Sequence, residues 1–122
     1  MIADAGSLVL RGLLDAETDF TQLDWQPFHP GVDIHELYPV SEDGCHAALL
    51  RYHPGTSVPR HRHQGYEHIL ILQGSQRDDL GEYQAGSLVI KRPGTSHKVF
   101  SDHGCIVLAI WQRPVQLLQS PE

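Results

Sequence analysis

The feature that most restricts the fold of this chain is the regular alternation of short apolar runs with turn residues. Clusters of glycine, proline, serine and aspartate interrupt the chain about every 8–12 residues, as in proteins built from short strands. No stretch shows the 3.6-residue apolar period of a convincing amphipathic helix. This spacing predicts an all-β protein, either a sandwich or a barrel.

The apolar and alternating runs mark the expected strands. Residues 25–30 contain two prolines, so we expect no regular structure there. Gly74 is expected to end the apolar run at 69–72, and the run at 105–111 is expected to be buried on both faces. The expected strands are 32–38, 45–52, 69–72, 87–91, 97–100 and 105–111.

Three potential metal ligands lie within seven residues, at His61, His63 and Glu67. On an extended chain, side chains separated by an even number of residues point to the same face, so the three are expected to share one face of one strand and its entry turn. Imidazole and carboxylate both bind divalent metal ions. The stretch therefore predicts a metal site at the entrance to the buried strand. Six other histidines have no ligand-like spacing and are expected to be surface or locally hydrogen-bonded residues: His29, His35, His46, His53, His68 and His103.

This stretch resembles the first motif of the cupin superfamily, G-x5-H-x-H-x3-E-x6-G. All five fixed positions match at the required spacing, and they are Gly55, His61, His63, Glu67 and Gly74.

The second cupin motif, G-x5-P-x-G-x2-H-x3-N, is matched in part. Gly86, Gly94 and His97 match, whereas Arg92 stands in place of proline and Ser101 in place of asparagine. These departures concern loop geometry more than metal binding, because His97 keeps its distance from Gly94.

Residues 25–112 as a whole resemble the ChrR-like cupins. The resemblance implies an all-β double-stranded β-helix, the cupin jelly-roll barrel. It also implies that His61, His63, Glu67 and His97 bind one divalent ion inside the barrel. Zn, Fe, Ni and Mn all remain open as the metal, since an octahedral ion would keep two open positions and tetrahedral Zn²⁺ would keep none.

We divide the chain into an N-terminal extension at 1–24, the cupin domain at 25–112 and a C-terminal tail at 113–122. The extension is expected to pack on the barrel or on a partner subunit. Both faces of 69–72 and of 105–111 are apolar, so we expect a homodimer. ChrR-type anti-sigma factors carry a separate N-terminal zinc domain with a His and Cys cluster. This chain has no such cluster, so no sigma-factor-binding domain is expected.

The composition excludes several classes of partner. Lys and Arg number 9 against 15 Asp and Glu, giving a net charge of −6, which argues against nucleic acid. No apolar run approaches the roughly 20 residues that span a bilayer, and the N-terminus is a poor signal peptide, so we expect a cytoplasmic protein. Cys45 and Cys105 lack metal-site spacing and are expected to be reduced thiols in the core.

Two functions from different classes remain open. The first is a stand-alone metal-binding module that senses or binds a small ligand in a regulatory or stress response. The alternative is an Fe(II)-dependent dioxygenase that cleaves a diketone or hydroxyketone, and in that case the catalytic residues are unknown. Tyr66 and Arg51 are candidates for the pocket wall, with a position on the strand rim equally open.

Overall fold

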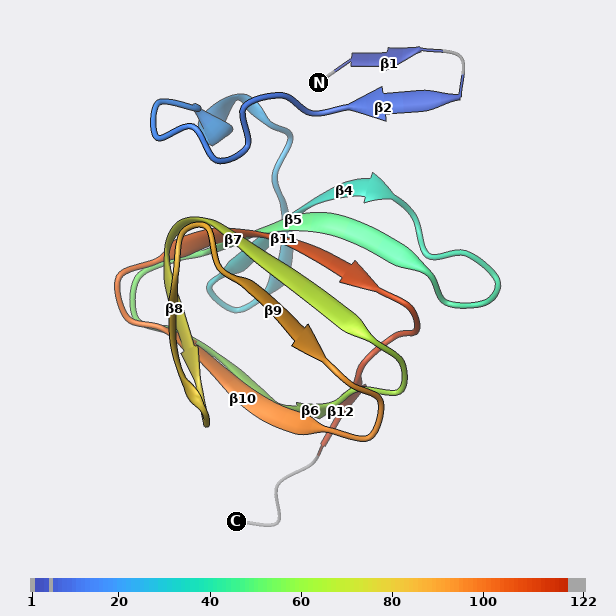
Figure 1. The fold of residues 1–122 in the computed structure, drawn as a ribbon, viewed down its shortest axis with the longest axis vertical. Helices are drawn as coiled ribbons and strands as arrows, with labels where there is room; N and C mark the ends of the chain where they lie inside the picture. The colour runs from blue at the N-terminus through green and yellow to red at the C-terminus, as the bar shows by residue number, and fades with distance from the viewer. Residues whose placement is uncertain (1, 5, 119–122) are drawn as a thin grey trace.

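The computed structural model describes residues 2–4 and 6–118, and this part of the chain is almost entirely β-structure (Figure 1). The all-β prediction is confirmed. A short 3₁₀ helix, η1, covers Phe20–Gln22. The strands are β1 (Ile2–Asp4), β2 (Ser7–Val9), β3 (Gln26–His29), β4 (Val32–Tyr38), β5 (His46–Tyr52), β6 (Thr56–Arg62), β7 (Glu67–Asp78), β8 (Gly81–Gln84), β9 (Leu88–Lys91), β10 (Ser96–Ser101), β11 (Cys105–Trp111) and β12 (Gln116–Leu117).

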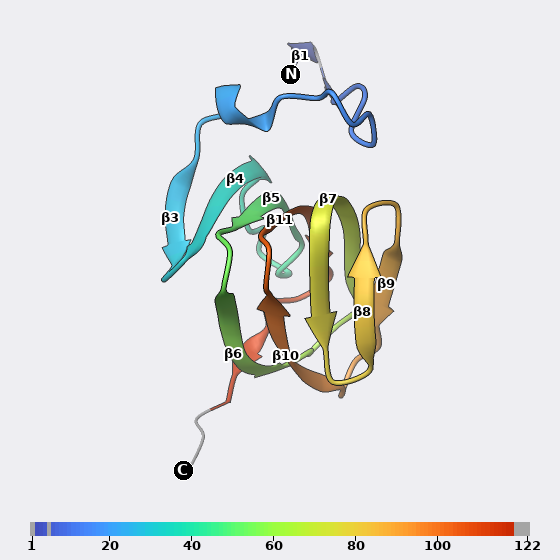
Figure 2. The same ribbon diagram turned by 90° about the vertical axis from the view of Figure 1, so that its left-hand side faces the viewer.

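Ten of these strands form one antiparallel sheet that curls into a half-closed barrel (Figures 1 and 2). The strand order is β12-β6-β10-β7-β11-β5-β4-β3, with β8 and β9 also paired to β7. The curl places β6 and β10 across the interior from β5 and β11. Because β7 is long enough to pair with β11 and β9 at one end and with β8 at the other, it joins the two sides.

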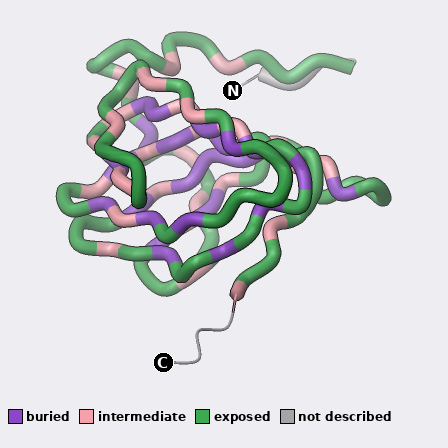
Figure 3. The backbone as a smooth tube through the Cα atoms, turned by 60° about the horizontal axis from the view of Figure 1, so that its bottom comes forward, coloured by how far each residue is buried: buried purple, intermediate pink, exposed green. Residues whose placement is uncertain are grey.

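Alternating side chains fill the interior of the curl, which Figure 3 shows as buried segments interspersed with exposed ones along the strands. In β11, Cys105, Val107, Ala109 and Trp111 point inward. The prediction that this strand is buried on both faces was wrong at Ile110, whose side chain is 37% exposed on the outer face.

The N-terminal segment packs against part of that outer face. Phe20 is buried there against Leu49 and Leu72, with Leu13 and Trp25 beside them. The Asp19 side chain caps η1 by accepting a hydrogen bond from the Thr21 backbone N–H at 2.9 Å. The β1–β2 hairpin lies away from the barrel (Figures 1 and 2), and Leu8 and Val9 are exposed.

Two local predictions were wrong. Residues 26–29 form a strand despite Pro27, because β3 is at the edge of the sheet, where a missing N–H donor is tolerated. Gly74 does not end its strand, since β7 continues to Asp78. Instead Gly74 adopts a φ of 76° next to a register shift against β11, and the strand bends there from one side of the barrel to the other.

Within the described residues, no helix is both long and apolar enough to cross a membrane. Cys45 and Cys105 are unpaired thiols, and burial raises the pKa of Cys105 to about 11.

We predict that Gly74→Ala lowers the free energy of unfolding of the metal-free protein by at least about 2 kcal/mol, because the positive φ disfavours a side chain. An added Cβ would also collide with the backbone carbonyl oxygen of Gly104. Gly81→Ala is the matched control, since its Cβ would meet nothing within 4 Å, and a change within about 0.5 kcal/mol is expected there. Urea unfolding measures both, and equal effects would show that the bend at Gly74 is not constrained.

Candidate metal centre

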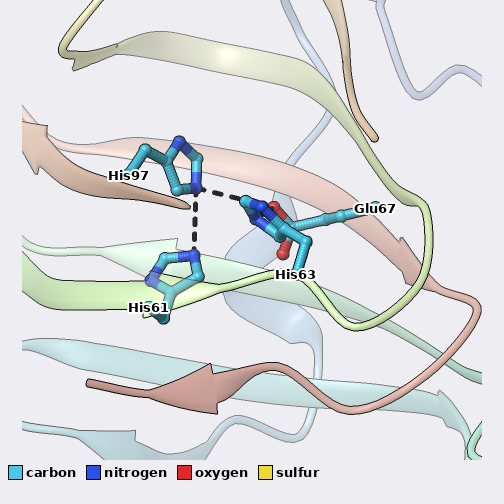
Figure 4. A group of neighbouring side chains, drawn as sticks. All are labelled: His61, His63, Glu67 and His97. Carbon is cyan, nitrogen blue, oxygen red and sulfur yellow. Dashed lines mark hydrogen bonds and ion pairs between the residues drawn. The ribbon is translucent and has the colours of Figure 1, made fainter. Parts of the chain in front are cut away.

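Four polar side chains converge in the interior of the barrel (Figure 4): His61, His63, Glu67 and His97. One ligand atom from each lies within 4.8 Å of all the others, and none of the four residues is more than 5% exposed. His97 Nε2 is 2.9 Å from His61 Nε2 and 3.7 Å from Glu67 Oε1. His63 Nε2 is 2.9 Å from the same carboxylate oxygen. The structure therefore brings together all four of the residues singled out in the sequence.

The four residues come from three strands and one loop. His61 lies near the end of β6 and is directly paired with His97 of β10. His63 lies in the loop after β6, and Glu67 is the first residue of β7. The prediction that His61, His63 and Glu67 share one strand and its entry turn was wrong, because a loop separates two strands between them. They converge because the β6–β7 connection turns back on itself.

Backbone hydrogen bonds fix the position of the His63 loop. The His63 N–H donates to the Thr95 carbonyl at 2.8 Å, and the Gly94 N–H donates to the His63 carbonyl at 2.8 Å. These bonds attach the loop after β6 to the loop before β10. Two separate parts of the sequence are thereby held at one place in the site.

Each histidine directs its second ring nitrogen toward an oxygen acceptor outside the cluster. His61 Nδ1 lies 3.1 Å from the Pro59 carbonyl oxygen, and His63 Nδ1 lies 3.0 Å from the Thr95 carbonyl oxygen. His97 Nδ1 lies 2.9 Å from Asp78 Oδ2. An Nδ1–H that donates to such an acceptor leaves the Nε2 lone pair facing the cluster, which is the arrangement typical of metal-binding histidines.

The electrostatics of the cluster favour a neutral His61 ring beside an ionised Glu67 carboxylate. Burial lowers the pKa of His61. Burial alone would raise the pKa of Glu67, but the adjacent His63 ring and then the His97 ring hold it well below the usual range of a carboxyl group. The other Glu67 oxygen, Oε2, accepts a hydrogen bond from the Trp111 indole N–H. The carboxylate is thus ionised and oriented by a buried indole.

These contacts fit a cation. With both Nδ1 atoms donating outward, His61 Nε2 and His97 Nε2 present lone pairs to each other across 2.9 Å, a repulsive contact unless a cation lies near both. Three imidazole nitrogens and a carboxylate oxygen are a donor set for a divalent transition metal. The cluster could therefore hold a metal ion, and the donor set is compatible with Zn, Fe, Ni and Mn.

The cluster lies on the wall of an interior cavity of about 50 Å³. His61, Glu67 and His97 contribute its polar part. The rest is almost wholly apolar, from Phe28, Val32, Leu50, Tyr52, Val58, Ile69, Val99, Val107, Ala109, Trp111, Val115 and Leu117, with His29 as the other polar residue.

Two candidates for the pocket wall lie elsewhere. Tyr66 is 44% exposed and is not among the residues that line the cavity. The Arg51 guanidinium donates to Asp33 Oδ2 at 2.7 Å on another part of the sheet. Their position on the strand rim agrees with the structural alternative that was left open for them.

Sequence reasoning missed two residues that contact the cluster. Trp111 could have been found, because it has the same parity as the inward-facing Val107 and Ala109 on β11. Asp78 carried no such signal, since it lies in a polar stretch next to a turn. Burial alone would raise the pKa of Asp78, yet hydrogen bonds from Lys91 and His97 hold it well below the usual range.

The sequence matches the ChrR cupin-like domain family over residues 14–115. Among curated proteins, it is similar to the anti-sigma-E factor ChrR of Cereibacter sphaeroides, with 36% identity over 72 residues. That match covers 57% of this chain and 34% of ChrR, so the chain corresponds to about a third of the length of this relative.

Solved structures agree with the cupin fold. The complex of Rhodobacter sphaeroides SigE with the anti-sigma factor ChrR matches with a TM-score of 0.69 and 30% identity, over 76% of this chain and 51% of that chain. An acetylacetone dioxygenase from Acinetobacter johnsonii matches with a TM-score of 0.75 over 98% of this chain and 86% of that chain. Its identity of 16% means that this likeness concerns the fold alone. The prediction of a cupin jelly roll is confirmed.

We predict that His61→Ala and His97→Ala each lower the affinity for Zn²⁺ at least about 100-fold, because each removes one of four ligands. Competition against a chromophoric chelator measures the affinity. His68→Ala is the control, because His68 adjoins Glu67 in sequence but pairs with Ile90 and Ile110 and is absent from the cluster. Wild-type affinity in His97→Ala would exclude His97 as a ligand.

Proposed function

Because the chain belongs to the ChrR cupin-like domain family, we propose that it is a metal-binding module that senses or binds a small molecule in a regulatory or stress response. The observation that carries this proposal is the position of the His61, His63, Glu67 and His97 cluster on the wall of a small apolar cavity. A metal ion held there is accessible to a small molecule that enters the cavity. The similarity to ChrR supports a regulatory setting, while sigma-factor binding stays a property of that relative, of which only 34% is matched.

The residues around the site have different roles. His61, His63 and His97 would hold the ion through Nε2, and Glu67 would hold it through Oε1. A bound divalent ion would supply Lewis-acid chemistry, or redox chemistry in the case of iron. Trp111 orients Glu67, and the apolar lining keeps bulk water and charged solutes from the cluster.

The size of the cavity favours this function over the dioxygenase alternative. A cavity of about 50 Å³ has room for on the order of three or four water-sized molecules. An apolar cavity that binds benzene is about 150 Å³. A chelating diketone has at least as many heavy atoms as benzene and exceeds the volume of the cavity at the cluster. A diatomic molecule or water fits within it.

We also propose that the chain forms a homodimer and has no nucleic-acid partner. An exposed apolar strip on the outer face of β9 and β11, formed by Leu88, Ile90 and Ile110, supports a homodimer. The net charge of −6 supports the absence of a nucleic-acid partner.

We predict that the Fe²⁺-loaded protein binds nitric oxide, used as a diatomic probe, and does not consume oxygen when acetylacetone is added. Electron paramagnetic resonance measures the nitrosyl signal, and an oxygen electrode measures uptake. His97→Ala and free Fe²⁺ at the same concentration are the controls. Acetylacetone-dependent oxygen uptake that scales with iron content and disappears in His97→Ala would contradict the sensing function and support the dioxygenase function. A protein that takes up no iron or zinc would contradict both functions.

A further inference from the structure

A second buried polar cluster adjoins the metal centre and is centred on Asp78, the last residue of β7. Its carboxyl group accepts four hydrogen bonds. Oδ2 accepts from His97 Nδ1 at 2.9 Å and from Lys91 Nζ at 2.8 Å. Oδ1 accepts from the Tyr83 hydroxyl at 2.8 Å and from the Leu80 backbone N–H at 2.9 Å. The Lys91 ammonium can only donate, and its pairing with Oδ2 stabilises the ionised carboxylate.

Burial makes these bonds energetically important. The side chain of Asp78 is 3% exposed, that of His97 is 3% exposed and that of Lys91 is 10% exposed. Charged groups in such a place require partners, because water does not solvate them. Lys91 supplies the balancing positive charge, and it is paired in register with Glu67 across β7 and β9. The Asp78–Lys91 pair is connected to the metal centre through His97, whose ring contacts Asp78 and lies 3.7 Å from Glu67 Oε1.

The three histidines are not held alike. His61 and His63 each have a neutral backbone carbonyl at Nδ1, whereas His97 has the Asp78 carboxylate. Hydrogen bonds to an ionised acceptor are roughly twice as strong as neutral ones. A carboxylate at one ring nitrogen fixes the tautomer and makes the other nitrogen a more basic ligand. Nothing in the two cupin motifs covers position 78.

We propose that Asp78 is the positioning residue of the metal centre: it fixes the His97 ring with Nδ1–H directed outward, so that Nε2 faces the other members of the cluster. Lys91 opposes this effect by sharing Oδ2 and by placing a positive charge near the site. This inference rests on the proposed metal-binding function.

The charge arrangement predicts opposite effects for two substitutions. Asp78→Asn keeps an oxygen that accepts from the Leu80 N–H but removes the charge-assisted bond to His97. It should weaken Zn²⁺ binding by about 10- to 100-fold. In Lys91→Met, Asp78 Oδ2 accepts a hydrogen bond only from His97, and a positive charge near the cation site is lost. It should bind Zn²⁺ at least as tightly as the wild type.

Tyr83→Phe is the matched control, because it removes a donor to Oδ1 and leaves the Oδ2 bond to His97 unchanged. Its Zn²⁺ affinity should stay within about threefold of the wild type. Chelator competition at constant pH measures the affinity of each variant. The unfolding temperature of each metal-free variant separates loss of folding from loss of affinity. A merely structural role for Asp78 would make all three variants lose affinity in proportion to stability.

A second measurement needs no variant. Nitrogen-15 NMR of the histidine rings in the wild-type protein, with and without Zn²⁺, should show His97 protonated at Nδ1 in both states and bound to Zn²⁺ through Nε2. Ligation through Nδ1, or wild-type affinity in Asp78→Asn, would overturn the role of Asp78 while leaving the metal centre intact. A wild-type protein that binds no Zn²⁺ would overturn both proposals.

Discussion

Three imidazoles and a carboxylate lie in the apolar interior of a half-closed barrel, and the structure depends on partners for their polar atoms. Polar groups in such an interior are costly unless every donor and acceptor has a partner. The fold satisfies the outer nitrogen of each ring through Pro59, Thr95 and Asp78. The inner nitrogens face one another and Glu67, where a metal ion could complete the arrangement.

The topology explains how residues so far apart in the sequence meet. β10 is paired with β6 and also with β7. His97 on β10 therefore lies close both to His61 at the end of β6 and to Glu67 at the start of β7. The bend of β7 at Gly74 then carries its second half to the other side of the barrel, where Asp78 reaches the back of His97. A single strand thus supplies a ligand at its first residue and the support of another ligand at its last.

The sequence predicted the members of the buried cluster better than it predicted their local geometry. Fixed spacing between Gly55 and Gly74 identified three of the cluster residues, because the loop length between two strands is constrained by the site itself. The same spacing predicted that these residues share one strand and its entry turn. This was wrong because side chains an even number of residues apart can also converge when the chain reverses, as it does between His63 and Glu67. The edge position of Pro27 depended on strand order, which local sequence does not determine.

The contact between Asp78 and His97 could not be predicted from the local sequence for a similar reason. It joins residues that are 19 positions apart in the sequence, and it arises from the bend of β7 and the β7–β8 turn. The second apolar face of β7 is another case. The apolar faces of 69–72 and 105–111 predict a homodimer, and on one of these faces the N-terminal segment around Phe20 covers Leu72 within the same chain.

The most direct test of a metal centre built from these four residues is a crystal structure of protein grown with one equivalent of Zn²⁺, with anomalous data collected at the zinc edge. The account predicts one anomalous peak per chain, bonded to Nε2 of His61, His63 and His97 and to Oε1 of Glu67. An empty cluster together with a zinc peak elsewhere on the chain would contradict it.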